Sequence, residues 1–128
     1  MKLFVYGTLL RGERNHHVMA GATLLFERCT LQAKMYDTGA GYPAIDLDKD
    51  FTVLGEVYEI QDHMWPGLDE LEGHSGNLET DLYSKEIVNV QTDEGLVEAV
   101  VYTLCDATMR SISIPHGDWV TYRKSLEK

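Results

Sequence analysis

The sequence predicts an α+β domain in which a small, mostly antiparallel β-barrel carries short flanking helices. Three observations lead to this expectation: short apolar runs separated by turn residues, a tight-turn signal between two of these runs, and only two segments with helical spacing. With 128 residues, 44% of them hydrophobic, the chain fits one domain over residues 1–128. A domain of this size buries enough surface to fold without a disulfide or a structural metal.

Five runs are expected to form strands. The clearest pair is Tyr83–Gln91 with Leu96–Leu104, because Asp93-Glu94-Gly95 between them favours a tight turn. Phe51–Ile60 has apolar residues on both alternating faces, which indicates a buried strand, and Gly55 within it suggests a bulge or a bend. The other two runs are Lys2–Tyr6 and Thr23–Met35.

Two segments are expected to be helical. In Asp62–Glu72, Asp62 is a candidate N-cap, Pro66 lies near the first turn and Gly73 is a C-terminal stop signal. The second helix begins near Asp118. Its apolar residues recur at helical spacing, at Trp119, Tyr122 and Leu126.

The charge balance argues against polyanionic partners. Eleven Lys and Arg stand against 21 Asp and Glu, a net charge of −10, whereas phosphate backbones and anionic membranes need a surplus of cations. No apolar stretch approaches the ~20 residues of a membrane span, and none near Met1 has signal-peptide length. Cys29 and Cys105 are interpreted as small buried hydrophobes. We therefore expect a cytoplasmic domain that binds neither nucleic acid nor membrane.

The sequence gives no signal for a metal or a cofactor. No two histidines are four residues apart on a helix, and no Cys-x-x-Cys, phosphate-binding loop or dinucleotide fingerprint occurs. A Gly-x-Ser-x-Gly nucleophile motif is also missing, although a serine triad is not excluded by spacing. The histidines are His16, His17, His63, His74 and His116.

The first predicted helix offers one carboxylate for chemistry. At about 100° per residue, Glu72 projects beside Leu68 on the apolar stripe, whereas Glu70 points away and Asp69 lies at the margin. Only Glu72 should therefore face inward. The helix C-terminus and partial burial both raise a carboxyl pKa towards neutrality, which suits a general base. The alternative is a surface helix end whose acids are all solvated. The apolar stripe consists of Met64, Leu68 and Leu71, with Trp65 at its edge.

A second candidate is the tetrad Tyr6-Gly7-Thr8-Leu9, directly after the first predicted strand. A strand that leads into glycine can turn backbone N–H groups towards a carboxylate or an oxyanion. The alternative is an ordinary turn after a strand. Gly39-Ala40-Gly41-Tyr42-Pro43 is likewise either a loop or part of a site.

Together these blocks resemble the γ-glutamylcyclotransferase-like superfamily, within its AIG2-like and γ-glutamylamine cyclotransferase branch. The order and spacing of six blocks carry the resemblance, which runs nearly from end to end. The blocks are VYGTLLRGERNH (Val5–His16), MYDTGAGYPA (Met35–Ala44), VLGEVYEI (Val53–Ile60), LDELEG (Leu68–Gly73), Tyr83 before a strand, and IPHGDW (Ile114–Trp119).

The resemblance implies a barrel with a cavity at its open end and an enzyme that acts on a small γ-glutamyl substrate without a cofactor. Members of the family cleave a γ-glutamyl amide by intramolecular attack of its α-amine, which releases 5-oxoproline and a free amine. By this resemblance Glu72 is the catalytic acid and base, and the tetrad binds the glutamyl group through backbone amides. The full set of implied substrate-binding residues is Tyr6, Gly7, Thr8, Leu9, Gly39, Tyr42, Pro43 and Tyr83.

Two departures from the family pattern bear on the leaving group. Lys85 stands where family members often carry arginine, and the polar segment His74–Leu82 would form part of the cavity rim. Tyr102 is a plausible cavity wall, but a structural aromatic is the favoured interpretation. Two other functions stay open: a non-catalytic binding module that uses the same cavity, and a structural or partner-binding domain.

Overall fold

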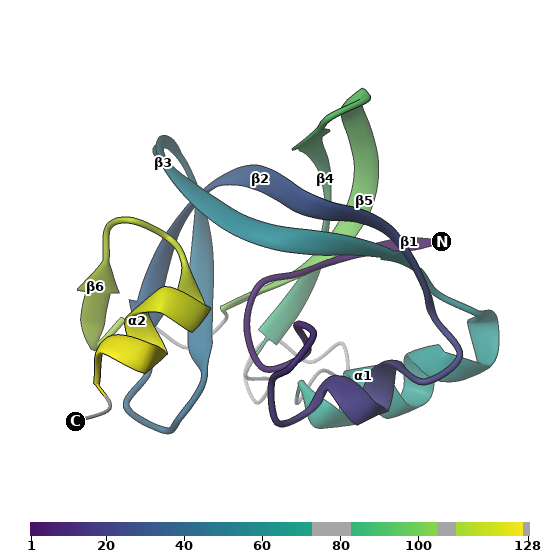
Figure 1. Ribbon diagram of the computed structural model, residues 1–128, viewed down its shortest axis with the longest axis horizontal. Coiled ribbons are helices and arrows are strands. Elements are labelled where there is room, and N and C mark those ends of the chain that lie inside the picture. Colours follow the sequence, from purple (N-terminus) through teal and green to yellow (C-terminus); the bar gives the residue numbers. More distant parts are fainter. Residues whose placement is uncertain (73–82, 105–109, 127–128) are drawn as a thin grey trace.

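The computed structural model describes residues 1–72, 83–104 and 110–126 (Figure 1). In these residues six strands are combined with two 3-10 helices and two short α-helices. The elements are β1 (Lys2–Val5), the 3-10 helix η1 (His16–Met19), β2 (Thr23–Asp37), β3 (Pro43–Glu59), the 3-10 helix η2 (Asp62–Met64), α1 (Trp65–Leu71), β4 (Tyr83–Thr92), β5 (Gly95–Leu104), β6 (Ile112–Ile114) and α2 (Trp119–Ser125).

Strands β1 to β5 close into a mixed barrel. The strand order is β3-β1-β5-β4-β2, and a further pairing of β2 with β3 joins the two ends. Only β1 and β5 are parallel, paired at Leu3 and Val100, and every other pairing is antiparallel. The predicted small, mostly antiparallel β-barrel with short helices is confirmed.

The long strands β2 and β3 extend beyond the barrel. Figure 1 shows α2 and β6 near one end of this two-stranded ribbon and α1 near the other. Strand β6 pairs with the last residues of β2, Met35 opposite Ile114, and Trp119 of α2 packs into the core beside them. The predicted apolar stripe of α2 is buried at its start only. Trp119 lies in the core, whereas Leu126 is exposed.

Gly55 allows the closest approach between β3 and β1. A side chain at this position would place its Cβ 2.2 Å from the carbonyl oxygen of Val5 and 2.6 Å from the ring of Phe4. The opposing strand β2 changes register at the same level, between Phe26 and Cys29. The extra residue of this irregularity therefore belongs to β2 and not to the strand of Gly55, and the glycine is required because the obstacle is backbone.

Several local predictions need correction or stay outside the described residues. Strand β3 begins at Pro43 and not at Phe51, and the short strand β6 was not predicted. Asp62 is not an N-cap, because the segment starts as a 3-10 helix and no side chain caps it. Asp118 does precede α2 and accepts a hydrogen bond from the Thr121 N–H.

Two remaining expectations concern the cysteines and the membrane. Cys29 is fully buried, as predicted, whereas Cys105, like Gly73, lies outside the described residues. In the described residues, no helix combines the length and the apolar character that crossing a bilayer requires.

Candidate active site

A cavity of about 300 Å³ opens where the end of β1, the start of β3 and the end of α1 meet. The first residues of β4 and the last residues of β5 complete its wall. Among the described residues, its lining is rich in tyrosine and contains one carboxylate and one guanidinium. The lining residues are Phe4, Val5, Tyr6, Gly7, Thr8, Leu9, Arg14, Asn15, Tyr42, Pro43, Leu71, Glu72, Tyr83 and Tyr102.

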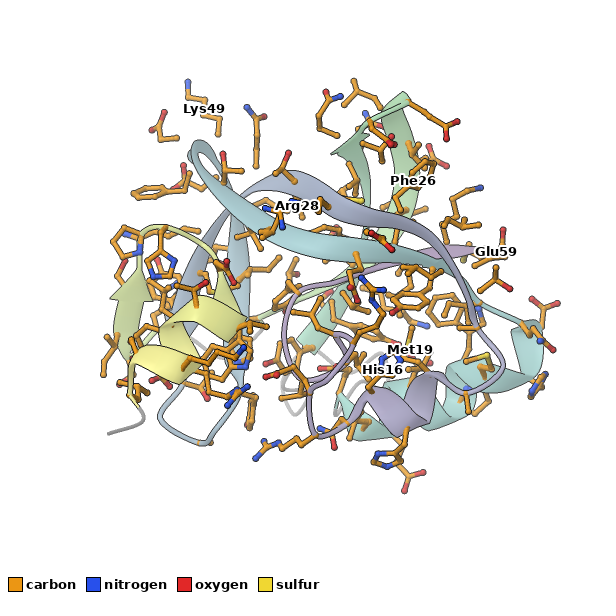
Figure 2. The ribbon with its side chains drawn as sticks, viewed as in Figure 1. His16, Met19, Phe26, Arg28, Lys49 and Glu59 are labelled. Carbon is orange, nitrogen blue, oxygen red and sulfur yellow. The ribbon has the colours of Figure 1, made fainter. Side chains whose placement is uncertain are left out.

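The turn after β1 is fixed by packing and by its own hydrogen bonds. The pyrrolidine ring of Pro43 packs on Gly7, so that a Cβ there would lie 2.5 Å from a ring carbon. The Asn15 N–H donates to the Thr8 carbonyl at 3.0 Å, and the Asn15 side chain donates to the Thr8 hydroxyl at 3.1 Å. In addition, His16 on η1 (labelled in Figure 2) places Nδ1 2.8 Å from the Leu9 carbonyl.

These contacts leave the backbone donors of the turn unused. Among the hydrogen bonds that the described residues form, none uses the N–H of Gly7, Thr8 or Leu9 as its donor. Gly7 and Leu9 are themselves buried. Buried N–H groups are normally paired, so the turn is well suited to bind an anion or a carbonyl oxygen.

Tyrosines form the opposite wall, and their hydroxyl groups are held by backbone carbonyls. Tyr6 donates to the Tyr102 carbonyl at 2.6 Å, and Tyr83 donates to the Pro43 carbonyl at 2.5 Å. The rings of Tyr42 and Tyr83 lie with their centroids 6.3 Å apart. Burial, more than any other cause, raises the pKa of Tyr6 and Tyr83 above the usual phenol value, so both stay protonated.

Glu72 enters this cavity from the C-terminal end of α1. It is the C-cap residue, and its N–H donates to the Leu68 carbonyl at 3.0 Å. In the described part of the chain, its partly buried side chain forms no hydrogen bond or ion pair. Burial raises the pKa of this carboxyl from 4.5 to about 7. A smaller contribution of its charge raises the phenol pKa of Tyr6, Tyr83 and Tyr102, which indicates that all three surround it.

The prediction that Glu72 is the only carboxylate of this helix to face inward is wrong, because Asp69 faces the barrel as well. This carboxylate accepts a hydrogen bond from the Tyr102 hydroxyl at 2.7 Å and from the Lys85 ammonium at 3.0 Å. The Lys85 ammonium also lies 4.8 Å from the centre of the Trp65 ring. The face of α1 that meets the barrel is thus rotated towards Asp69, and Leu71 of the predicted stripe is 40% exposed.

The structure brings together all but one of the site residues expected from the sequence. The turn residues Tyr6-Gly7-Thr8-Leu9, together with Tyr42, Pro43, Tyr83 and Glu72, line the cavity. Gly39 does not: it lies in the exposed turn between β2 and β3, where its N–H donates to the Asp37 side chain at 2.8 Å.

The sequence analysis missed part of the cavity lining, and it interpreted Tyr102 as structural. Arg14, Asn15, Phe4, Val5 and Leu71 were not expected at the cavity, and no local pattern marks them. Tyr102, interpreted as structural, contributes to the wall. Lys85 is absent from the lining and instead pairs with Asp69. His74–Leu82 lies outside the described residues.

The chemical groups at the cavity suit proton transfer rather than metal binding. Within the residues that the structure describes, no three His, Cys, Asp or Glu side chains gather in a way that would hold a metal ion. The cavity instead combines unused backbone donors with one carboxyl group that titrates near neutrality. That pairing can stabilise a developing oxyanion and exchange a proton with a bound amine.

Comparison with known proteins gives the same picture over nearly the whole chain. The family described as "Gamma-glutamyl cyclotransferase, AIG2-like" matches residues 3–121. The gamma-L-glutamyl-butirosin B gamma-glutamyl cyclotransferase of Niallia circulans is 37% identical over 122 residues, which cover 94% of this chain and 76% of that protein.

Two solved structures share the fold. YkqA from Bacillus subtilis superposes with a TM-score of 0.79 at 29% identity, over 99% of this chain and 42% of YkqA. An AIG2-like protein from Mus musculus superposes with a TM-score of 0.77 at 26% identity, over 92% of this chain and 86% of the mouse protein.

Proposed function

The chain belongs to the gamma-glutamyl cyclotransferase, AIG2-like family, and we propose that it cleaves a γ-glutamyl amide into 5-oxoproline and a free amine. The observation that carries this proposal is Glu72, a partly buried carboxyl without a hydrogen bond to the described residues, at a tyrosine-lined cavity. Its raised pKa, about 7, lets it both accept and return a proton near neutral pH.

The first step that we assign to Glu72 is activation of the nucleophile. The α-amino group of a γ-glutamyl substrate is an ammonium ion with an unperturbed pKa near ~8, and it cannot attack while protonated. The ionised Glu72 carboxylate removes one proton. The amine nitrogen then attacks the γ-carbonyl carbon of the same molecule and forms a five-membered ring. Because the attack is intramolecular, folding of the substrate in the cavity supplies much of the rate.

The second step is collapse of the tetrahedral intermediate. Its oxyanion is stabilised by the N–H groups of Gly7, Thr8 and Leu9, which are unused among the described residues. The bond from the γ-carbon to the leaving nitrogen breaks as Glu72 delivers a proton to that nitrogen. A second proton passes through Glu72 from the ring nitrogen to the leaving nitrogen, which departs as an ammonium ion. In total the α-nitrogen loses two protons and the leaving nitrogen gains two, so Glu72 returns to its starting state and no water is consumed.

The protonated tyrosines serve binding in this proposal. Tyr6 and Tyr83 keep their hydroxyl groups on backbone carbonyls, so they form rigid walls and do not compete with Glu72 as acids. Pro43 packs on Gly7 and so fixes the turn, and Tyr42 lies beside Tyr83 in the wall that would confine the glutamyl chain. As part of the same proposal, we place the protein in the cytoplasm.

Mass spectrometry of 5-oxoproline tests the proposal. The protein is incubated with ε-(γ-glutamyl)-lysine, γ-glutamyl amino acids, simple γ-glutamylamines and glutathione. The matched variants are Glu72→Gln and Glu70→Gln, since Glu70 is an exposed carboxylate on the same helix. We expect product from the wild type and from Glu70→Gln only. Ligand-induced stabilisation without any product would contradict turnover and favour a binding module.

A further inference from the structure

Of the described residues that line the cavity, one is cationic: Arg14, which the proposed reaction does not use. In the part of the chain described, Arg14 forms no ion pair, although the chain carries 21 acidic residues against 11 cations. Arg11, Arg110 and Arg123 do pair with carboxylates. An unpaired guanidinium at a cavity is available to a ligand that carries a carboxylate.

The position of Arg14 is set by the turn between β2 and β3. Its guanidinium packs on Gly41, where an added Cβ would lie 3.1 Å from one guanidinium nitrogen. Gly41 has φ +92°, a backbone conformation that favours glycine. The next residue, Tyr42, is itself a cavity wall, so the guanidinium lies along the cavity edge.

Exposure distinguishes the inner end of the cavity from the outer end. Gly7 and Leu9 are buried and Glu72 is partly buried, whereas Arg14 and Gly41 are exposed. The reacting amide must lie at Glu72 and at the turn donors, so the glutamyl group occupies the inner end. The leaving group then extends towards the exposed end, where Arg14 is the cation that the described part of the lining provides.

We propose that Arg14 binds a carboxylate on the leaving amine, so that the preferred substrates are γ-glutamyl amino acids rather than simple γ-glutamylamines. This inference rests on the proposed function and specifies its substrate class. The bonds that form and break are those given above, and the released amine is a free amino acid. Planar bidentate pairing makes arginine well suited to a carboxylate.

Two substrates that differ by one carboxylate test this assignment. γ-Glutamyl-alanine and γ-glutamylethylamide share the glutamyl group and the two-carbon unit on the leaving nitrogen. Release of 5-oxoproline gives kcat/KM for each substrate with the wild type, Arg14→Gln, Arg14→Lys and Arg28→Gln. Arg28, labelled in Figure 2, is an exposed arginine outside the cavity lining, so its variant controls for the loss of one positive charge.

The expected result is a change in preference. The wild type and Arg28→Gln favour γ-glutamyl-alanine, Arg14→Gln lowers the ratio of the two kcat/KM values by about tenfold, and Arg14→Lys lowers it less. A ratio that Arg14→Gln leaves unchanged overturns the assignment. If both substrates weaken together, Arg14 binds the glutamyl group instead, which also overturns it.

A binding measurement separates this assignment from the proposed function. Calorimetry with both compounds is carried out on Glu72→Gln and on the double variant Glu72→Gln/Arg14→Gln, so that turnover does not interfere. Tighter binding of γ-glutamyl-alanine that depends on Arg14, with no 5-oxoproline from the wild type, would support the carboxylate site and contradict the catalytic proposal. Equal binding of both compounds would contradict the carboxylate site at Arg14 and would leave the catalytic proposal untouched.

Discussion

Two carboxylates on one short helix have opposite surroundings. Asp69 accepts hydrogen bonds from Tyr102 and Lys85, which tie α1 to strands β5 and β4. Glu72, three residues later, forms no hydrogen bond or ion pair within the described chain and faces the cavity. The first carboxylate is occupied by structural contacts, whereas the second is partly buried without such contacts.

This difference explains how one helix provides both an anchor and a reactive group. A paired carboxylate has its lone pairs engaged and holds a fixed geometry. An unpaired, desolvated carboxylate favours its neutral form, so its pKa rises to about 7 and it can exchange protons at neutral pH. The contacts of Asp69 thus keep α1 in place, while Glu72 stays available for the proton transfers that we propose.

The largest contrast is expected in turnover. Glu72→Gln removes the acid and base, which typically contributes 10²–10⁴-fold, so kcat should fall by about 1000-fold. Asp69→Asn keeps an oxygen for the Tyr102 hydroxyl and should lower kcat by only about tenfold, through displacement of α1. Steady-state release of 5-oxoproline measures both. Equal losses in the two variants would remove the functional distinction between them.

Glu72→Gln should raise the stability of the fold at neutral pH, although it lowers kcat. The folded pKa of Glu72 lies above its unfolded value, so the folded state binds a proton more tightly and loses stability as the pH rises from 4.5 to about 7. Above pH 7 the variant should be more stable than the wild type by about 2–3 kcal/mol, and near pH 4 the two should be equal. Urea denaturation across this range is the measurement. If the free energies of unfolding of the wild type and Glu72→Gln differ by a constant amount from pH 4 to pH 8, Glu72 is not desolvated.

Asp69→Asn should destabilise the fold by a smaller amount. The substitution removes the charge partner of Lys85 while it preserves shape, and the pair is only partly exposed, so we expect a loss of about 1–2 kcal/mol at pH 7. The same urea experiment at pH 7 compares it with Glu72→Gln. Identical signs for these two acid-to-amide substitutions would contradict the proposed division of roles.

The smallest effect is expected at Lys85. Lys85→Met removes its ion pair with Asp69 and its contact with the Trp65 ring, for a cost of about 1 kcal/mol or less. Lys85→Arg retains both interactions and serves as the control. Since Lys85 is outside the cavity lining, KM should stay within about twofold in both variants. A larger change in KM would place Lys85 in substrate recognition.

Local sequence patterns predicted those parts of the barrel that short-range chemistry determines. The β4–β5 hairpin follows from its turn residues, and its register pairs Thr92 with Gly95 as expected for a tight connection. The first half of β3 was missed because its charged residues resemble a loop. Its pairing with β2 jumps from Thr52 to Leu47 across the excursion 48–51, so no regular strand pattern runs through this part of the sequence.

In the candidate site, too, some residues could be predicted from local spacing and others could not. The inward projection of Glu72 could be deduced from helical spacing, but that of Asp69 could not, because Tyr102 and Lys85 come from strands far along the chain. The preceding residues 62–64 form a 3-10 helix, with about 120° per residue in place of 100°, which shifts the phase of the stripe. Arg14 was missed because it lies in a loop, and its place at the cavity depends on contacts with residues far along the chain, such as Gly41.

The ionisation of Glu72 is the central claim, and it can be measured directly. Carbon-detected NMR of side-chain carboxyl groups follows each glutamate through a pH titration, and the spectrum of Glu72→Gln identifies the Glu72 resonance by its disappearance. We predict a midpoint at about pH 7 for Glu72. A midpoint near the ordinary 4.5 would contradict the account, because the carboxyl would then be solvated and too weak a base for the proposed reaction.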